Sequence, residues 1–128
     1  MAETKRIFIA DDDDVVLTSL KKLLDISGFE VSTTTNPKEV VSMIKAFKPH
    51  LILLDLLMPV IGGLEICEIL NSDKETQSIP IIILSAVGNY TDIKHSYKLG
   101  VIGYITKPYE FPLLLKEIQK AIAFKEGQ

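Results

Sequence analysis

Five short apolar runs along the chain, each bounded by turn residues or acidic residues, predict β-strands. They cover residues 5–10, 29–33, 50–54, 81–84 and 101–106. The segments between these runs carry apolar residues at helical spacing. Two such sets follow the order i, i+4, i+7 and i+8: Val16, Leu20, Leu23 and Leu24, and then Leu114, Ile118, Ala121 and Ile122. We therefore expect amphipathic helices, each with one apolar face, between the strands.

Helix boundaries are marked by a few residues of known preference. Asn36 followed by Pro37, with Glu39 two residues further on, is typical of a helix start: an N-cap, a proline at the first helical position and a glutamate at the third. Gly28 and Gly100 stand where helices are expected to end.

Alternating strands and helices with apolar central strands predict an α/β fold, in which helices cover both faces of a parallel sheet. Right-handed crossovers favour a doubly wound sheet of five strands and five helices. With 128 residues, 47% of them hydrophobic, the chain has the size and apolar content of a single domain spanning residues 1–128. Ligands of such sheets bind beyond the carboxyl ends of the strands, near the point where the strand order reverses.

Acidic residues follow two of the predicted strands. The first runs into residues 11–14, which are four consecutive aspartates, and the third runs into Asp55. Carboxylates gathered at buried strand ends repel one another, so they need a cation, a lysine or a shared proton. Mg²⁺ prefers such oxygen ligands, and we expect Asp11, Asp12 and Asp55 to hold it. The alternative is that the run only caps a helix, a role that we assign to Asp13 and Asp14.

Two further polar residues fall at strand ends. Ser85 closes the fourth strand and Lys107 closes the fifth. A hydroxyl and a lysine can both meet a phosphoryl group, and a metal ion with a lysine would balance the charge of a phosphorylated aspartate. Either residue alone is more often merely solvated. Their coincidence with the acidic cluster favours a phosphoryl site.

The overall charge and the single cysteine narrow the range of functions. The net charge is −3, with an isoelectric point near 5.4, so no overall positive field favours nucleic acid or an anionic membrane. Cys67 stands alone and excludes an intrachain disulfide framework. Residues 51–61 are too short to span a bilayer, and residues 1–6 do not resemble a secretory signal. We expect a cytoplasmic protein.

Taken in order along the chain, these motifs resemble the receiver domain of two-component response regulators over essentially the whole sequence. The matching residues are Asp11-Asp12, Asp55, Met58-Pro59 with Gly63 beyond, Ser85-Ala86, and Lys107-Pro108 preceded by Tyr104. The resemblance implies the flavodoxin-like receiver fold, with strand order 2-1-3-4-5.

The same resemblance implies a role for each of these residues. Asp55 would be the phosphoacceptor. Asp12 and Asp55 would bind Mg²⁺ or Mn²⁺ directly, Asp11 through water, and Leu57 through its backbone carbonyl. Ser85 and Lys107 would bind the phosphoryl group, Ser85 and Tyr104 would form the switch, and the bond before Pro108 would be cis. Phosphorylation would then bias a surface built from the fourth helix, the fifth strand and the fifth helix.

The implied partners are a histidine kinase or a histidine phosphotransfer protein, and a downstream output protein or domain. Direct binding of nucleic acid or membrane is not expected, and phosphorylation-dependent homodimerisation stays open, as does whether the chain is a stand-alone regulator. Two functions are considered. The first is a signalling phosphoacceptor, which is not an enzyme except that it catalyses its own phosphorylation and dephosphorylation. The alternative is a Mg²⁺-dependent phosphohydrolase with an aspartyl-phosphate intermediate. Hydrolases of the haloacid dehalogenase type carry a second aspartate two residues after the nucleophile, where this chain has Leu57. A flavin-binding module is disfavoured, because the four aspartates would repel the flavin phosphate.

Overall fold

Five strands alternate with helices in the computed structural model, which describes residues 3–56, 62–86 and 90–127, and only the backbone of residues 90–92. The elements are β1 (Arg6–Ala10), α1 (Asp14–Ile26), β2 (Glu30–Thr34), a 3₁₀ turn (Pro37–Glu39), α2 (Val40–Phe47), β3 (Leu51–Leu54), α3 (Gly63–Ser72), β4 (Ile81–Ser85), α4 (Tyr90–Lys98), β5 (Val101–Thr106) and α5 (Phe111–Glu126). Every strand lies within one residue of its predicted bounds.

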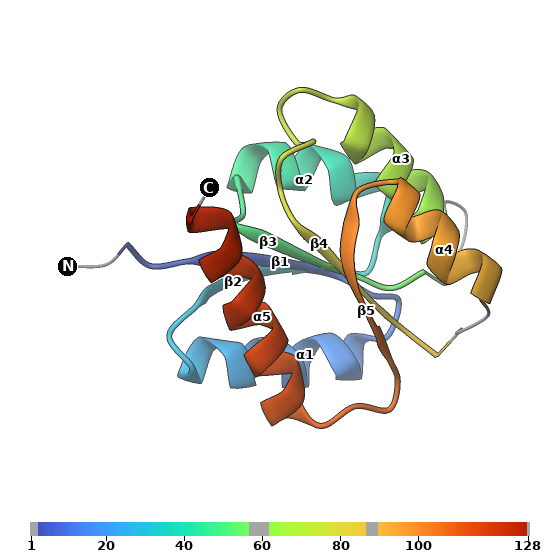
Figure 1. Cartoon of the computed structure of the whole chain (residues 1–128). Helices are drawn as coiled ribbons and strands as arrows, with labels where there is room; N and C mark the ends of the chain where they lie inside the picture. The colour runs from blue at the N-terminus through green and yellow to red at the C-terminus, as the bar shows by residue number, and fades with distance from the viewer. Residues whose placement is uncertain (1–2, 57–61, 87–89, 128) are drawn as a thin grey trace.

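The sheet is parallel throughout, with the order β2-β1-β3-β4-β5, as expected. Helices α1 and α5 cover one face, α2 and α3 cover the other, and α4 lies beside the edge strand β5 (Figure 1). The chain runs outward from β1 to β2 and then crosses back to β3, so the order reverses between β1 and β3. Because β1 and β3 pair in parallel, their carboxyl ends lie side by side at this reversal, where ligands of such sheets bind.

The central strands are buried on both faces. On β1, Ile7 and Ile9 pack toward α1 and α5, while Phe8 packs toward α2 and α3. All four residues of β3 are fully buried. Because full burial of a large apolar side chain contributes about 1.5–3 kcal/mol, these strands anchor the fold. None of the helices in the described ranges combines the length and apolar content needed to cross a membrane.

The apolar face of α1 differs from the predicted one. Leu20 and Leu24 are buried as expected, but the third core residue is Leu17, while Leu23 is 42% exposed and Val16 is half-buried. Helix α1 has more apolar residues than one face can bury, and the position of the sheet determines which of them are buried. The corresponding set on α5, Leu114 to Ile122, is buried as predicted.

The predicted helix boundaries are confirmed, with one difference. The Asp13 carboxylate caps α1 by accepting from the backbone N–H groups of Val15 and Val16, a bond pattern that stabilises a helix by about 1 kcal/mol. Gly28 and Gly100 have φ angles of 99° and 90°, the left-handed conformation expected after a helix. Asn36 caps a single 3₁₀ turn, so α2 itself begins only at Val40.

At the amino ends of the strands, Arg6 joins β1 to the turn that follows α2. Its guanidinium donates to the carbonyl oxygens of Phe47 and Lys48 at 2.7–3.1 Å, which satisfies the end of that helix. The backbone N–H of Arg6 donates to Nδ1 of His50 at 2.9 Å. This network lies at the edge of the sheet opposite to the aspartate cluster.

Candidate functional site

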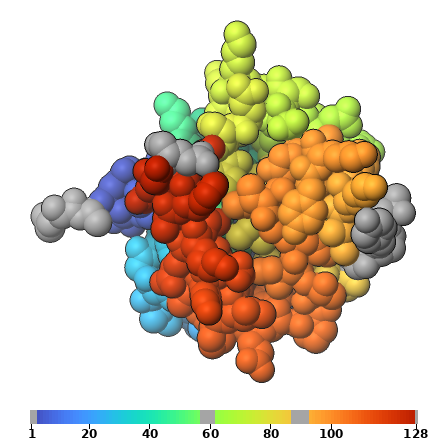
Figure 2. Space-filling model, viewed as in Figure 1, coloured from blue at the N-terminus to red at the C-terminus, as the bar shows by residue number. Residues whose placement is uncertain are grey.

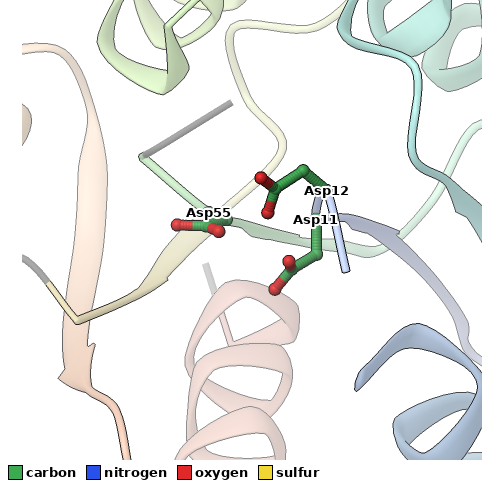
Figure 3. Close-up of side chains that lie close together, drawn as sticks. All are labelled: Asp11, Asp12 and Asp55. Carbon is green, nitrogen blue, oxygen red and sulfur yellow. The ribbon is translucent and has the colours of Figure 1, made fainter. Parts of the chain in front are cut away.

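Three carboxylates meet at the carboxyl edge of the sheet. Asp11 and Asp12 follow β1 and Asp55 follows β3, and Figure 3 shows their side chains gathered around one space. One oxygen from each lies within 4.8 Å of the others. Asp11 and Asp55 are buried, with exposures of 3% and 6%, whereas Asp12 is exposed. The three aspartates of the expected metal-ligand set therefore converge, although they lie up to 44 positions apart in the sequence.

Backbone hydrogen bonds hold this cluster in place. The Asp55 N–H donates to the carbonyl of Ala10 at 3.0 Å, which extends the pairing of β1 and β3 by one step. The Asp13 N–H donates to Oδ1 of Asp11 at 3.0 Å and fixes the direction of that carboxylate. The first bond joins neighbouring strands and the second is local to the segment after β1, so strand pairing and the local backbone together position the acidic side chains.

Lys107 lies among the carboxylates. Its Nζ donates to Oδ2 of Asp11 at 2.6 Å and lies 3.7 Å from Oδ2 of Asp55. Burial of the ammonium works to lower the pKa of Lys107, but the hydrogen bond and charge of Asp11, with the charge of Asp55, outweigh it. The pKa is raised above its ordinary value. Lys107 therefore carries a positive charge at neutral pH and partly offsets the acidic cluster.

Ser85 and Lys107 are brought together by the last pairing of the sheet. Ser85, which is fully buried, pairs with Thr106 across β4 and β5. The Lys107 N–H donates to the Ser85 carbonyl at 2.9 Å. The peptide bond between Lys107 and Pro108 is cis, the isomer that the family resemblance implies.

Tyr104 lies on β5, three residues before Lys107. It pairs with Ile83 on β4, is half-buried, and packs against the core on the side of α2 and α3. The neighbouring strand carries Ser85 two residues beyond Ile83. The two residues expected to form the switch thus occupy adjacent strands at the same end of the sheet.

Gly63 has a role that sequence reasoning did not give it beyond its place in a motif. Its N–H donates to the carbonyl of Leu56 at 3.0 Å. A Cβ atom on Gly63 would lie 2.6 Å from the Asp55 carbonyl oxygen and 2.7 Å from the Leu56 Cα. Only glycine lets the start of α3 approach the backbone behind Asp55 this closely. Leu57, which the resemblance makes a metal ligand, lies outside the described residues.

The residues present fit a divalent cation. Three carboxylates and one ammonium leave the cluster with an excess of negative charge, and two of the carboxylates are almost completely buried. Oxygen ligands of this kind suit Mg²⁺ and Mn²⁺ better than softer metals. Both oxygens of Asp11 already accept hydrogen bonds from the protein, one from Asp13 and one from Lys107. Direct ligation of a cation by Asp11 would therefore compete with one of these two donors.

The sequence of this chain is similar to those of known response regulator receiver domains. The model of the response regulator receiver domain matches residues 7–119. The protein PilH of Pseudomonas aeruginosa is 32% identical over 118 residues, which cover 92% of this chain and 98% of PilH. The protein RcaC of Microchaete diplosiphon is 34% identical over 103 residues, which cover 80% of this chain. This chain spans only 16% of the length of RcaC.

The fold gives the same result. A CheY-like response regulator receiver domain protein from Methanospirillum hungatei superposes with a TM-score of 0.92, at 28% identity, over 98% of both chains. The aspartates at the carboxyl edge thus belong to a sheet whose whole topology matches that of a solved receiver domain.

Proposed function

Because the chain belongs to the response regulator receiver domain family, we propose that Asp55 accepts a phosphoryl group from a phosphohistidine of a histidine kinase or a histidine phosphotransfer protein. The observation that carries this proposal is the convergence of Asp11, Asp12, Asp55 and Lys107 at one edge of the sheet. A buried carboxylate beside a paired lysine has both the nucleophile and the positive charge that the transfer needs.

In the proposed transfer, a carboxylate oxygen of Asp55 attacks the phosphorus atom. A phosphorus–oxygen bond forms as the phosphorus–nitrogen bond to the donor imidazole breaks, and the electron pair of that bond stays with the imidazole. Lys107 is 3.7 Å from Asp55, so a small movement of its ammonium group lets it donate to the transferred phosphoryl oxygens. The Ser85 hydroxyl is the second proposed donor.

We assign the metal site to Asp12 and Asp55 as direct ligands, to Asp11 through water, and to the backbone carbonyl of Leu57. When bound, Mg²⁺ or Mn²⁺ would supply positive charge that offsets the phosphoryl oxygens. Asp11 meanwhile holds Lys107 at 2.6 Å and orients it toward Asp55.

Phosphorylation adds negative charge and strong hydrogen-bond acceptors at Asp55. In our proposal Ser85 moves toward the phosphoryl group and Tyr104 moves inward behind it. The surface formed by α4, β5 and α5 then changes its affinity for an output protein or domain. The position of the two switch residues on adjacent strands supports this coupling.

The proposal covers residues 1–128 as one receiver unit. This chain matches PilH over 98% of the length of PilH, but it matches RcaC over only 16% of the length of RcaC. Its relatives therefore include proteins of about its own length and much longer ones. The output, homodimerisation after phosphorylation and cytoplasmic location stay predictions.

Intact-mass spectrometry after incubation with Mg²⁺ and acetyl phosphate tests the proposal. We expect a mass gain of one phosphoryl group in the wild type, none in Asp55→Asn, and none when EDTA replaces Mg²⁺. Asp25→Asn, which changes an exposed aspartate on α1, is the matched control and keeps the gain. An unmodified wild type, or equal labelling of Asp55→Asn, would contradict the assignment. Sustained turnover of phosphoesters would indicate the phosphohydrolase instead.

A further inference from the structure

The amino ends of β1 and β3 are joined by the side chain of His50 as well as by the backbone. The His50 N–H donates to the Arg6 carbonyl at 2.8 Å, and the Arg6 N–H donates to Nδ1 of the His50 imidazole at 2.9 Å. Nδ1 accepts a hydrogen bond only while it carries no proton. The structure therefore requires a neutral His50 whose proton is on Nε2.

Arg6 also supports the turn that follows α2. Its Nε and Nη2 atoms donate to the Lys48 carbonyl at 3.0 and 2.7 Å. Lys48 has a φ of 53°, a left-handed conformation that a residue other than glycine rarely adopts and that its surroundings must stabilise. Because the guanidinium is carried by the first residue of β1, the bond from Arg6 to His50 also helps to hold this strained turn.

Within the described residues, two acidic and two basic side chains act on the His50 imidazole by charge. Glu3 precedes β1, and its carboxylate lies 3.7 Å from Nε2 of His50 and 3.3 Å from Nη1 of Arg6. Lys5 pairs with Glu126 of α5 at 2.7 Å, and Figure 2 shows the blue atoms of the amino-terminal segment beside the red atoms at the end of α5. The four charges sum to zero while His50 is neutral.

Protonation would remove the acceptor from this arrangement. An imidazolium is a donor at both ring nitrogens, so it cannot accept from the Arg6 N–H. Burial, followed by the charges of Arg6 and Lys5, opposes this protonation and lowers the pKa of His50 below its ordinary value. The Glu3 carboxylate beside Nε2 is an acceptor for the charged ring. Protonation thus exchanges a bond to the Arg6 backbone for an ion pair with Glu3.

We propose that His50 is a pH-sensitive latch at the amino edge of the sheet. Neutral His50 holds the start of β1 to β3, whereas protonated His50 turns toward Glu3, releases the Arg6 N–H and loosens the start of β1 together with the turn after α2. The latch lies at the edge opposite to the aspartate cluster and goes beyond the proposed function, because it does not depend on phosphorylation of Asp55.

NMR spectroscopy of the whole ¹⁵N-labelled chain observes the bond directly, since an N–H···N hydrogen bond gives a scalar coupling between its two nitrogen nuclei. We expect a coupling between the Arg6 amide nitrogen and His50 Nδ1 at about pH 8, and its loss by about pH 5, on the two sides of the ordinary histidine pKa. The Nδ1 chemical shift reports protonation in the same spectra. Absence of the coupling at high pH, or an imidazole that stays neutral to about pH 5, would overturn the proposal.

Backbone order parameters measure the loosening. At Arg6 and Lys48 we expect a fall from about 0.85, typical of a rigid backbone, to below about 0.6 once His50 is protonated. Leu53, which is fully buried in β3, should stay near 0.85. An Arg6 amide that stays ordered after protonation would overturn the proposal, and an equal fall at Leu53 would show general acid unfolding in place of a local latch.

Three variants identify the group responsible. The Oδ1 atom of asparagine accepts hydrogen bonds at every pH, so His50→Asn should keep Arg6 ordered throughout. His95→Asn is the matched control, because His95 is the other histidine and is exposed on α4; it should keep the pH dependence of the wild type. Glu3→Gln removes the negative charge beside the imidazolium and should move the midpoint to lower pH. Circular dichroism establishes that each variant is folded.

The variants can also contradict the proposal. If Arg6 loosens in His50→Asn at the same pH as in the wild type, or if His95→Asn abolishes the effect, another group titrates. A midpoint that Glu3→Gln leaves unchanged would exclude the turn toward Glu3. The wild-type comparison of Arg6 with Leu53 needs no variant, and none of these measurements involves phosphorylation, so failure of the latch and failure of the phosphoacceptor assignment give different results.

Discussion

Replacing Gly63 with alanine is expected to disturb the proposed phosphorylation site through the backbone of Asp55. The new Cβ would meet the Asp55 carbonyl oxygen about 0.8 Å inside an ordinary contact distance of 3.4 Å, with the Leu56 Cα similarly close. Both atoms belong to backbone and cannot turn away. Overpacking of this kind costs about 1–3 kcal/mol. Since alanine favours a helix over glycine by about 0.5–1 kcal/mol, we expect a net loss of about 1–2 kcal/mol.

Urea denaturation and thermal melts of the two proteins measure this loss. For a chain of this size it corresponds to a fall in Tm of about 4–8 °C. The matched control is Gly62→Ala, because a Cβ there has no atom within 4 Å and the φ of Gly62 is −72°. The control is expected to stay within about 0.5 kcal/mol of the wild type, since a weaker N-cap and a less flexible unfolded chain nearly cancel.

The same variant has a functional readout. Because the contact falls on Asp55 itself, Gly63→Ala is expected to accept phosphate from acetyl phosphate more slowly than Gly62→Ala. A Gly63→Ala protein as stable as the control and phosphorylated at the same rate would refute the close approach that the structure shows.

Three further predictions concern charged or buried groups. Lys107→Met is expected to lose about 1–3 kcal/mol of stability in EDTA, because it removes the positive charge that offsets the buried Asp11 and Asp55 carboxylates. Added Mg²⁺ should raise the free energy of unfolding of the variant more than that of the wild type, and equal gains would speak against a shared site. Burial, followed by the charges of Arg6 and Lys5, lowers the pKa of His50 below 6.5, so the unfolded chain binds the proton more readily than the folded one. The stability that neutral His50 contributes is therefore complete above pH 6.5 and is lost as the pH falls through the folded pKa. Urea titrations should show the wild type losing more stability than His50→Asn over that range, and parallel losses would contradict the assignment. Burial raises the pKa of Cys67 to about 12, so iodoacetamide at pH 8 should label the native protein at least roughly a thousandfold more slowly than the urea-unfolded chain, and comparable rates would show that the α3 core opens readily.

Most of the fold was predictable from the sequence because its signals are local. A run of apolar residues between polar turns determines a strand over four to six positions, and all five strands were found within one residue. Helix caps are equally local, as Asp13, Gly28 and Gly100 show. The exposed Leu23 was misassigned because burial on α1 depends on where the sheet lies, which the helix sequence does not contain.

The candidate site was predictable in its members but not in its contacts. The parallel topology implied that Asp11, Asp55, Ser85 and Lys107 would share one edge. That Lys107 pairs first with Asp11, 96 positions away, depends on side-chain geometry that no spacing rule gives. Gly63 was found through a motif, but the sequence does not give its physical role. That role is to avoid a clash between a Cβ atom and the Asp55 carbonyl, which is evident only once α3 is placed against that backbone.

The Arg6–His50 network at the far edge of the sheet gives the molecule an internal reference for hydrogen exchange. The Arg6 amide is bonded to His50 at one end of β1, and the Asp55 amide is bonded to Ala10 at the other. Exchange at the first reports local opening at the amino ends of the strands, while exchange at the second reports local opening at the aspartates. The ratio of the two rates, measured in one sample, would separate the effect of a phosphodonor on the site from its effect on the opposite end of the sheet.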